Sequence, residues 1–379
     1  MTEKANRLES LDILRGLDLF TLTVFGPLLF AFAQTGDHTW LAPVLTQFTH
    51  TSWEGFRVWD MIMPLFLFMT GTTIPFSLAK YKLTSSEGRK KVAWRIGKRV
   101  LLLWIFGMMF QGNLLDFDPA TLKLFSNTLQ SIAVGYLFAA IFFLTTRPRT
   151  QIIIAALLLF AYWALMMFVK VPGYGGGDLT PDGNLCEYVD RAVFGHWRDG
   201  ASVDAAGNVV FSEHYRYTWI LSSLCFIVTV MTGAFAGMIL KSGWSEKKKM
   251  LTMLIAGVAM IAAGWLWGLQ MPVIKKIWTS SMTLVTSGYA FLLLLIFYYI
   301  VDYKGHNKGL SWLKIWGMNS ILAYMLQMIS FSSVGQSLFH GLEKYVGTEW
   351  YGFILTVVNL AIYFLILRIL YKRNIYLRV

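Results

Sequence analysis

The sequence predicts an all-α membrane protein, a polytopic bundle of about ten transmembrane helices with the N-terminus and the C-terminus in the cytoplasm. The 379 residues are 56% hydrophobic and only 14% charged, whereas a soluble domain carries about 25% charged residues. So much apolar side chain cannot be hidden in one water-soluble core of this size, and a bilayer is the natural solvent. We expect residues 1–379 to form a single transmembrane domain.

Ten stretches are apolar and long enough to cross a bilayer, which takes about 20 residues per helix. In chain order they are residues 11–34, 57–80, 96–115, 126–146, 151–169, 217–240, 249–269, 280–301, 312–333 and 350–371. The first stretch is longer than the apolar core of a signal peptide and lacks a small-residue cleavage site. We therefore expect it to remain as the first span.

Lysine and arginine residues gather on alternate sides of these spans. Residues 89–91, 247–249 and 372–373 are basic runs that fall on the same side as the N-terminus. Positive residues favour the cytoplasmic side, so this alternation predicts that both termini lie inside. It also accounts for most of the net charge of +12, and we do not expect nucleic-acid binding.

The longest stretch between predicted spans is residues 170–216, which the same alternation places outside the cytoplasm. It begins with a glycine-rich run and continues with mixed polar residues, and it is too polar to cross a bilayer. Loops of this length often act as lids over a site. A plain surface excursion is an equally good interpretation.

The most informative segment leads from the outer side into the second predicted span. Thr51 and Glu54 have the spacing of a capping box, which would start a helix here. His50 lies just before it, at the outer membrane boundary, and imidazole suits proton transfer near neutral pH. Asp60 lies further in, at apolar depth, where an ionisable group is a functional candidate by default. His50 is thus a candidate catalytic base with Asp60 or Glu54 as its orienting carboxylate, and the alternative is an ordinary interfacial histidine.

Two other polar stretches are candidate binding sites. Lys275 and Lys276 precede Trp278 and three hydroxyl residues, a set that could hold an anionic or hydroxylated ligand. The alternative is an interfacial belt, in which tryptophan and lysine are common. Asn319 puts an amide inside the ninth predicted span, where it could bind substrate or join two helices.

These segments, in this order, resemble the heparan-alpha-glucosaminide N-acetyltransferase family and its bacterial transmembrane glucosamine acetyltransferase relatives. The resemblance covers nearly the full length of the chain. It is carried by residues 10–16, 50–55, 68–71, 93–95, 129–130, 135–136, 188–191, 233–237, 275–281 and 319–322, with Asp60 and Pro64. Residues 50–55 and 275–281 are the specific parts of the match.

The resemblance implies an acetyl-CoA-dependent N-acetyltransferase. An acetyl group would pass from cytosolic acetyl-CoA to the amine of glucosamine, or of a terminal glucosaminide, on the far side of the membrane. His50 matches the family's catalytic histidine. It would act either as a general base during direct transfer or as the carrier of an acetyl-histidine intermediate.

The remaining candidate residues divide between the two substrates. Arg95, Lys98 and Arg99 are expected at the cytosolic face, where they could bind the phosphates of CoA, and Gln130 from the matching segments joins this set. The sugar, or the oxyanion of the reaction, would be held by Lys275, Lys276, Trp278, Asn319 and Trp53.

Two other functions fit a membrane bundle. One is O-acetylation of a cell-surface polysaccharide, and the other is sugar transport, whose usual inverted repeats are not evident here. With two cysteines and no Cys/His cluster, we expect no metal. The expected partners are acetyl-CoA, a small sugar acceptor and the lipid bilayer, and related enzymes suggest a homodimer. We expect a bacterial inner membrane as the location.

Overall fold

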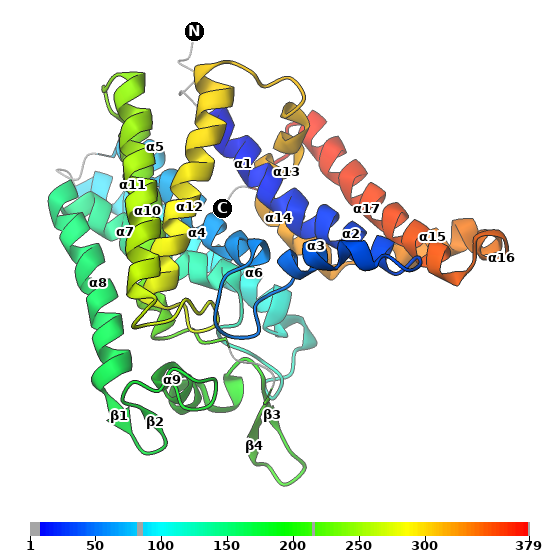
Figure 1. The fold of residues 1–379 in the computed structure, drawn as a ribbon, viewed down its shortest axis with the longest axis horizontal. Coiled ribbons are helices and arrows are strands. Elements are labelled where there is room, and N and C mark those ends of the chain that lie inside the picture. The colour runs from blue at the N-terminus through cyan, green and yellow to red at the C-terminus, as the bar shows by residue number, and fades with distance from the viewer. Residues whose placement is uncertain (1–7, 82–85, 214–216, 378–379) are drawn as a thin grey trace. The chain divides into compact units, whose positions relative to one another are not determined.

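The computed structural model describes residues 8–81, 86–213 and 217–377, and these form a mostly helical structure (Figure 1). Within these ranges, eight helices are long and apolar enough to cross a membrane. They are Glu9–Ala33, Val58–Leu78, Thr128–Thr145, Pro148–Phe168, Ser222–Lys241, Glu246–Trp267, Ser280–Tyr303 and Thr348–Lys372. The chain is therefore an integral membrane protein, and the predicted helical membrane class is confirmed.

Two of the ten predicted spans differ from this set. Residues 96–115 fall mostly in a continuous helix, α6 (Ser86–Gln111), whose sequence includes six basic residues that lower its hydropathy. Residues 312–333 do not form one helix. They are divided into η7 (Ser311–Leu313), α13 (Lys314–Met318), α14 (Ser320–Met325), η8 (Leu326–Met328) and the start of α15 (Ser332–Phe339). The first break is at Asn319, which has a non-helical backbone (φ −118°, ψ 42°).

The described residues divide into two compact units, and the first consists of those up to His50, Arg57–Ile62 and those from Leu293 onward. Its opening helix α1 (Glu9–Phe20) continues through a π-helical turn, η1 (Thr21–Phe25), into α2 (Gly26–Ala33). The other elements of this unit include η2 (Thr39–Leu41), α3 (Ala42–Gln47), η3 (Val58–Met61), η6 (Tyr298–Tyr303), η9 (His340–Leu342), α16 (Glu343–Val346) and α17 (Thr348–Lys372). A Cβ atom at Gly16 would lie 2.0 Å from the carbonyl oxygen of Leu313, and one at Gly317 would lie 1.9 Å from that of Asp12. Glycines at the α1–α13 contact therefore let the two backbones pack closely.

The second unit contains Thr51–Phe56 and Met63–Leu292. Its elements include α4 (Ile62–Thr72), α5 (Ile74–Leu78), α6, η4 (Leu114–Asp116), α7 (Thr128–Thr145), α8 (Pro148–Phe168), α10 (Ser222–Lys241), α11 (Glu246–Trp267) and α12 (Ser280–Phe297). Helix α10 packs against α5, α7, α8 and α11. A Cβ atom at Gly71 would lie 1.9 Å from the carbonyl oxygen of Val230, and one at Gly233 would lie 1.9 Å from that of Phe68. The glycine-containing segment 233–237 is therefore explained by close helix packing.

The predicted outer segment, residues 170–216, folds into a small structured region next to the end of α8 (Figure 1). It contains the antiparallel hairpins β1 (Lys170–Val171) with β2 (Tyr174–Gly175) and β3 (Ala201–Val203) with β4 (Val209–Phe211). Between the hairpins lie α9 (Leu185–Phe194) and η5 (Gly195–Trp197). Residues 214–216 of the predicted loop lie outside the described residues.

The predicted start of the second span at the Thr51–Glu54 capping box is wrong. Residues 51–56 are not helical, and Gly55 has a φ of 108°, a conformation that favours glycine. The helix begins instead at η3, where Asp60 Oδ2 accepts the backbone N–H of Arg57 at 3.1 Å. Asp60, rather than Glu54, is thus the carboxylate that caps this helix.

Candidate functional site

His50 and Asp60, two of the three predicted catalytic residues, contact each other through their side chains. The distance between His50 Nδ1 and Asp60 Oδ1 is 2.8 Å. The Asp60 side chain is fully buried, whereas that of His50 is 41% exposed. One end of the pair is therefore anchored inside the protein, and the imidazole at the other end reaches the surface of its unit.

The contact with a carboxylate favours one tautomer of His50. An ionised carboxylate only accepts hydrogen bonds, so Nδ1 carries the proton that Asp60 accepts. The lone pair then lies on Nε2. An imidazole oriented in this way by a buried carboxylate is the arrangement that serves as general base in histidine-dependent acyl transfer.

Aromatic packing fixes the turn that carries Asp60. A Cβ atom at Gly26 would lie 2.6 Å from the indole Cη2 of Trp59, so only glycine leaves room for this ring. The Trp59 ring also contacts Phe48, two residues before His50, at a centroid distance of 5.9 Å. The π-helical turn Thr21–Phe25 directly precedes Gly26, and such turns are frequent at functional sites.

The segment that follows His50 in the chain pairs with residues far away in the sequence. Glu54 forms an isolated antiparallel bridge with Ile274, and the N–H of Gly55 donates to the carbonyl oxygen of Val273 at 2.9 Å. The indole N–H of Trp53 donates to the carbonyl oxygen of Leu179 at 2.9 Å. The second unit therefore brings together three stretches that were singled out separately, residues 51–56, 170–216 and 275–281.

Within 275–281, the tryptophan and the hydroxyls serve the structure itself. Trp278 is 1% exposed, has a φ of 50°, and its indole N–H donates to Thr229 Oγ1 at 3.3 Å. The hydroxyls of Thr279 and Ser281 donate to the carbonyl oxygen of Pro272 at 2.9 and 3.0 Å. Trp278 is therefore packed in the interior of its unit.

The two lysines of this stretch differ in exposure. Lys275 is 5% exposed, and Lys276 is half-buried. The Lys276 carbonyl oxygen accepts the backbone N–H of Thr218 at 3.0 Å, and the carbonyl oxygen of Ile277 accepts the hydroxyl of Ser222 at 3.0 Å. The backbone that carries both lysines is therefore held by the residues that lead into α10.

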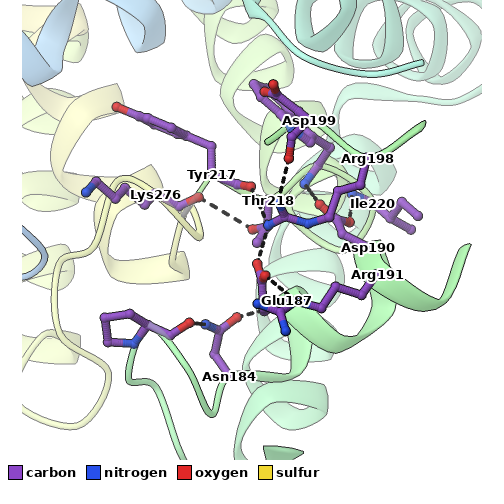
Figure 2. Close-up of polar contacts among 12 residues, drawn as sticks. Asn184, Glu187, Asp190, Arg191, Arg198, Asp199, Tyr217, Thr218, Ile220 and Lys276 are labelled. Atoms are coloured by element: carbon purple, nitrogen blue, oxygen red, sulfur yellow. Dashed lines mark hydrogen bonds and ion pairs between the residues drawn. The ribbon is translucent and has the colours of Figure 1, made fainter. Parts of the chain in front are cut away.

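A buried ionic network anchors the 170–216 segment to Trp219 and Ile220, two of the residues that lead into α10 (Figure 2). Glu187 accepts hydrogen bonds from Arg191 Nε at 2.7 Å and from the fully buried guanidinium of Arg198. Asp190 is also fully buried and accepts the backbone N–H groups of Trp219, at 2.7 Å, and Ile220, at 3.0 Å. Burial raises the pKa of Asp190 to about 7. These contacts favour a fixed structural element over a mobile lid.

The residues expected to bind CoA lie in the second unit. Arg95, Lys98 and Arg99 occupy positions i, i+3 and i+4 of α6, which lie on one helix face. Arg95 donates to the hydroxyl of Tyr81 at 3.1 Å. The guanidinium of Arg99 lies 4.2 Å from the ring centroid of Tyr136, and its buried Nε has no hydrogen-bond partner among the residues that the structure describes.

Gln130 and Asn319 hold other parts of the backbone. Both side chains are fully buried. Gln130 accepts the N–H of Ser126 at 2.8 Å and donates to the carbonyl oxygen of Leu124 at 2.6 Å. Asn319, in the first unit, donates to the carbonyl oxygen of Ile375 at 2.9 Å and accepts the N–H of Leu377 at 3.0 Å. Their amides therefore stabilise a turn and the C-terminal segment, respectively.

Sequence reasoning did not single out Arg57 or Trp59, although both contact the His50–Asp60 pair or the residues next to it. The available signal was position: both residues lie within three positions of Asp60 at the start of a helix. Arg57 contacts Thr49 in the preceding loop, and Trp59 packs against Gly26. Sequence spacing does not predict either contact.

Comparison with known proteins gives two relatives that align along nearly the whole chain. The chain is 27% identical over 433 residues to heparan-alpha-glucosaminide N-acetyltransferase of Mus musculus and 25% identical over 437 residues to that of Homo sapiens. The alignments cover 99% and 98% of this chain, and 61% and 60% of those proteins, so the chain spans about three fifths of their length. No protein-family model matches the chain. The two relatives confirm the resemblance seen in the sequence.

Proposed function

We propose that this chain, a distant homologue of the heparan-alpha-glucosaminide N-acetyltransferases, transfers an acetyl group from acetyl-CoA to the amine of glucosamine or of a terminal glucosaminide. The observation that carries the proposal is the His50–Asp60 pair. Its 2.8 Å contact joins a fully buried carboxylate to an exposed imidazole, which is what a general base needs in order to be both oriented and accessible.

The proposed reaction is a direct transfer. Nε2 of His50 takes a proton from the sugar amine while the amine nitrogen attacks the carbonyl carbon of the thioester. The carbon–nitrogen bond forms, the carbon–sulfur bond breaks, and CoA leaves as a thiolate that recovers the proton from the imidazolium. Asp60 stabilises the imidazolium that exists between these two steps.

For the donor, we propose that the basic face of α6 binds the phosphates of CoA. Arg95 and Lys98 are exposed there, and Arg99 has an N–H group without a partner in the described part of the chain. Guanidinium groups match phosphate oxygens in geometry and charge. The excess of basic residues on this side of the spans supports a cytosolic location for this face.

For the acceptor, we propose Lys275, Lys276 and Trp53 as residues that hold the sugar. Trp53 and the backbone before Lys275 belong to one paired structure in the second unit. The proposal also includes an extracytoplasmic acceptor, a bacterial inner membrane as the location and a homodimer as the assembly. These three features rest on the charge distribution of the sequence and on the resemblance.

The test is acetyl transfer by the purified chain in proteoliposomes, with acetyl-CoA and a panel of sugars analysed by mass spectrometry. We expect N-acetylglucosamine from glucosamine, together with release of the CoA thiol. An acetyl ester on a hydroxyl would identify an O-acetyltransferase. Accumulation of unmodified sugar inside the vesicles would identify a transporter, and either result would overturn the proposal.

His50→Ala tests the role of the imidazole. A general base contributes about 10²–10⁴-fold to the rate, so transfer should fall by at least this factor while binding of acetyl-CoA is retained. Incubation of the wild-type chain with acetyl-CoA alone, followed by peptide mass spectrometry, distinguishes the two routes. Direct transfer leaves His50 unmodified, whereas an acetyl-histidine intermediate would accumulate without acceptor.

A further inference from the structure

We infer that Arg57 is a positioning residue for the His50–Asp60 pair. Its side chain fixes the backbone that carries the imidazole, and its backbone fixes the carboxylate. The inference rests on the proposed function, because it assumes that His50 accepts a proton during acetyl transfer.

Four hydrogen bonds connect Arg57 with the two members of the pair and with Thr49. Its Nη1 donates to Thr49 Oγ1 at 2.6 Å and to the carbonyl oxygen of His50 at 3.1 Å. Its backbone N–H donates to Asp60 Oδ2 at 3.1 Å, and its carbonyl oxygen accepts the backbone N–H of Asp60 at 2.9 Å. One residue therefore contacts the imidazole-bearing backbone from one side and the carboxylate from the other.

His50 needs such support because of where it lies in the chain. Residues 48–50 follow the short helix α3 and have no regular secondary structure, and the His50 side chain is 41% exposed. Water can compete for the hydrogen bonds of an exposed imidazole, and a loop residue is not held by a helical or strand ladder. The 2.8 Å contact with Asp60 therefore depends on how firmly the backbone of Thr49 and His50 is held.

An arginine suits this role better than a lysine would. The guanidinium is planar and presents its N–H donors in a fixed fork, whereas an ammonium is a point charge on a flexible chain. Here one nitrogen reaches both a hydroxyl and a carbonyl oxygen on adjacent residues. Arg57 thereby limits the directions in which the imidazole can point, without touching the reacting atoms itself.

The test compares Arg57→Ala and Arg57→Lys with the wild-type chain in the proteoliposome assay. A displacement of about 1 Å at a catalytic group can cost about 10²-fold in rate, so we expect Arg57→Ala to lower kcat by about 10- to 100-fold. The KM values for acetyl-CoA and for the sugar should stay within threefold of wild type. Arg57→Lys should recover part of kcat, and added guanidinium ion should partly rescue Arg57→Ala.

Two further variants make the test specific. Thr49→Val removes one of the two acceptors and leaves the carbonyl oxygen of His50, so its kcat should lie between those of wild type and Arg57→Ala. Arg368→Ala removes an exposed arginine of α17 in the same unit and should leave kcat unchanged. If Arg57→Ala fails to fold, Arg57→Lys and Thr49→Val decide the question, because both keep most of the local contacts.

The outcomes separate this inference from the proposed function. If His50→Ala keeps full activity, the general-base role of His50 is wrong and the inference falls with it. If His50→Ala is inactive while folded Arg57→Ala or Thr49→Val keeps a wild-type kcat, only the positioning role of Arg57 is overturned. A rise in KM with unchanged kcat would show that Arg57 binds a substrate instead.

Discussion

Replacing Asp60 by asparagine removes the charge beneath His50 while keeping the shape of the side chain. Asp60 is fully buried and accepts from both His50 Nδ1, at 2.8 Å, and the backbone N–H of Arg57, at 3.1 Å. A hydrogen bond to a charged group contributes about 1.5–3 kcal/mol, and about 1.4 kcal/mol corresponds to a tenfold change in rate. If this stabilisation grows as the imidazolium forms, its loss alone lowers kcat by about 10- to 150-fold.

The asparagine can have a second effect through the tautomer of His50. If its amide nitrogen faces Nδ1, it donates a hydrogen bond there, and the proton of the imidazole moves to Nε2. The base then has no lone pair at the reacting nitrogen, and the loss approaches the whole contribution of a general base, about 10²–10⁴-fold. We therefore expect a fall in kcat of between about 10-fold and 10⁴-fold, with His50→Ala as the lower limit of activity.

The assay measures release of the CoA thiol under single-turnover conditions, with acetyl-CoA binding measured separately. Asp37→Asn is the matched control, because Asp37 is an exposed carboxylate of the same unit, and this variant should keep wild-type activity. A kcat of Asp60→Asn within threefold of wild type, together with an inactive His50→Ala, would refute the role of the carboxylate. Such a result would mean that the imidazole acts without the buried carboxylate.

Three further predictions concern packing, pH and donor binding. Gly26→Ala should lower the melting temperature in thermal unfolding, because its Cβ would lie 2.6 Å from the Trp59 ring and overpacking costs about 1–3 kcal/mol. The control is Gly352→Ala, which should be neutral or stabilising because no atom lies within 4 Å of its added Cβ. The pKa of Asp190 is raised from 3.8 to about 7 in the folded chain, so the stability that this group contributes is fully present below about pH 4 and is lost as the pH rises through 7. The melting temperature of wild type should therefore fall between pH 4 and pH 7, and that of Asp190→Asn should fall less. Equal slopes for the two proteins would contradict the raised pKa. Arg99→Ala should weaken acetyl-CoA binding about tenfold by calorimetry, since it removes one charge-assisted phosphate contact; unchanged affinity would place the nucleotide elsewhere.

The helical membrane class was predictable because hydropathy is a local property of the chain. A run of about 20 apolar residues has few alternatives to a spanning helix, and the eight long apolar helices correspond to eight of the predicted stretches. The ninth predicted stretch, 312–333, is apolar as well, but its hydropathy gives no sign of the break at Asn319. That break depends on the contacts of the Asn319 amide with Ile375 and Leu377, more than 50 residues along the chain.

The sequence placed His50 beside two candidate carboxylates and could not choose between them. Glu54 has the spacing of a capping box, and Asp60 has only its position in an apolar run. The choice depends on the backbone of Gly55, whose φ of 108° accompanies a non-helical segment around Glu54. The local spacing thus favoured a helix start at residues 51–54. In the structure, Glu54 and Gly55 pair with residues 273–274 instead of forming that helix start.

The pairing of residues 273–274 also explains the composition of the stretch that follows. The chain between α11 and α12 is irregular, and the polar backbone groups of irregular segments need partners when they are withdrawn from water. Thr279 and Ser281 satisfy the carbonyl oxygen of Pro272, while Ser222 satisfies that of Ile277. These hydroxyls are therefore needed to build the loop, whatever ligand it meets. In the proposed function, the sugar is held by the groups that the loop presents and not by those that build it. Lys276, the half-buried side chain of this stretch, fits that description.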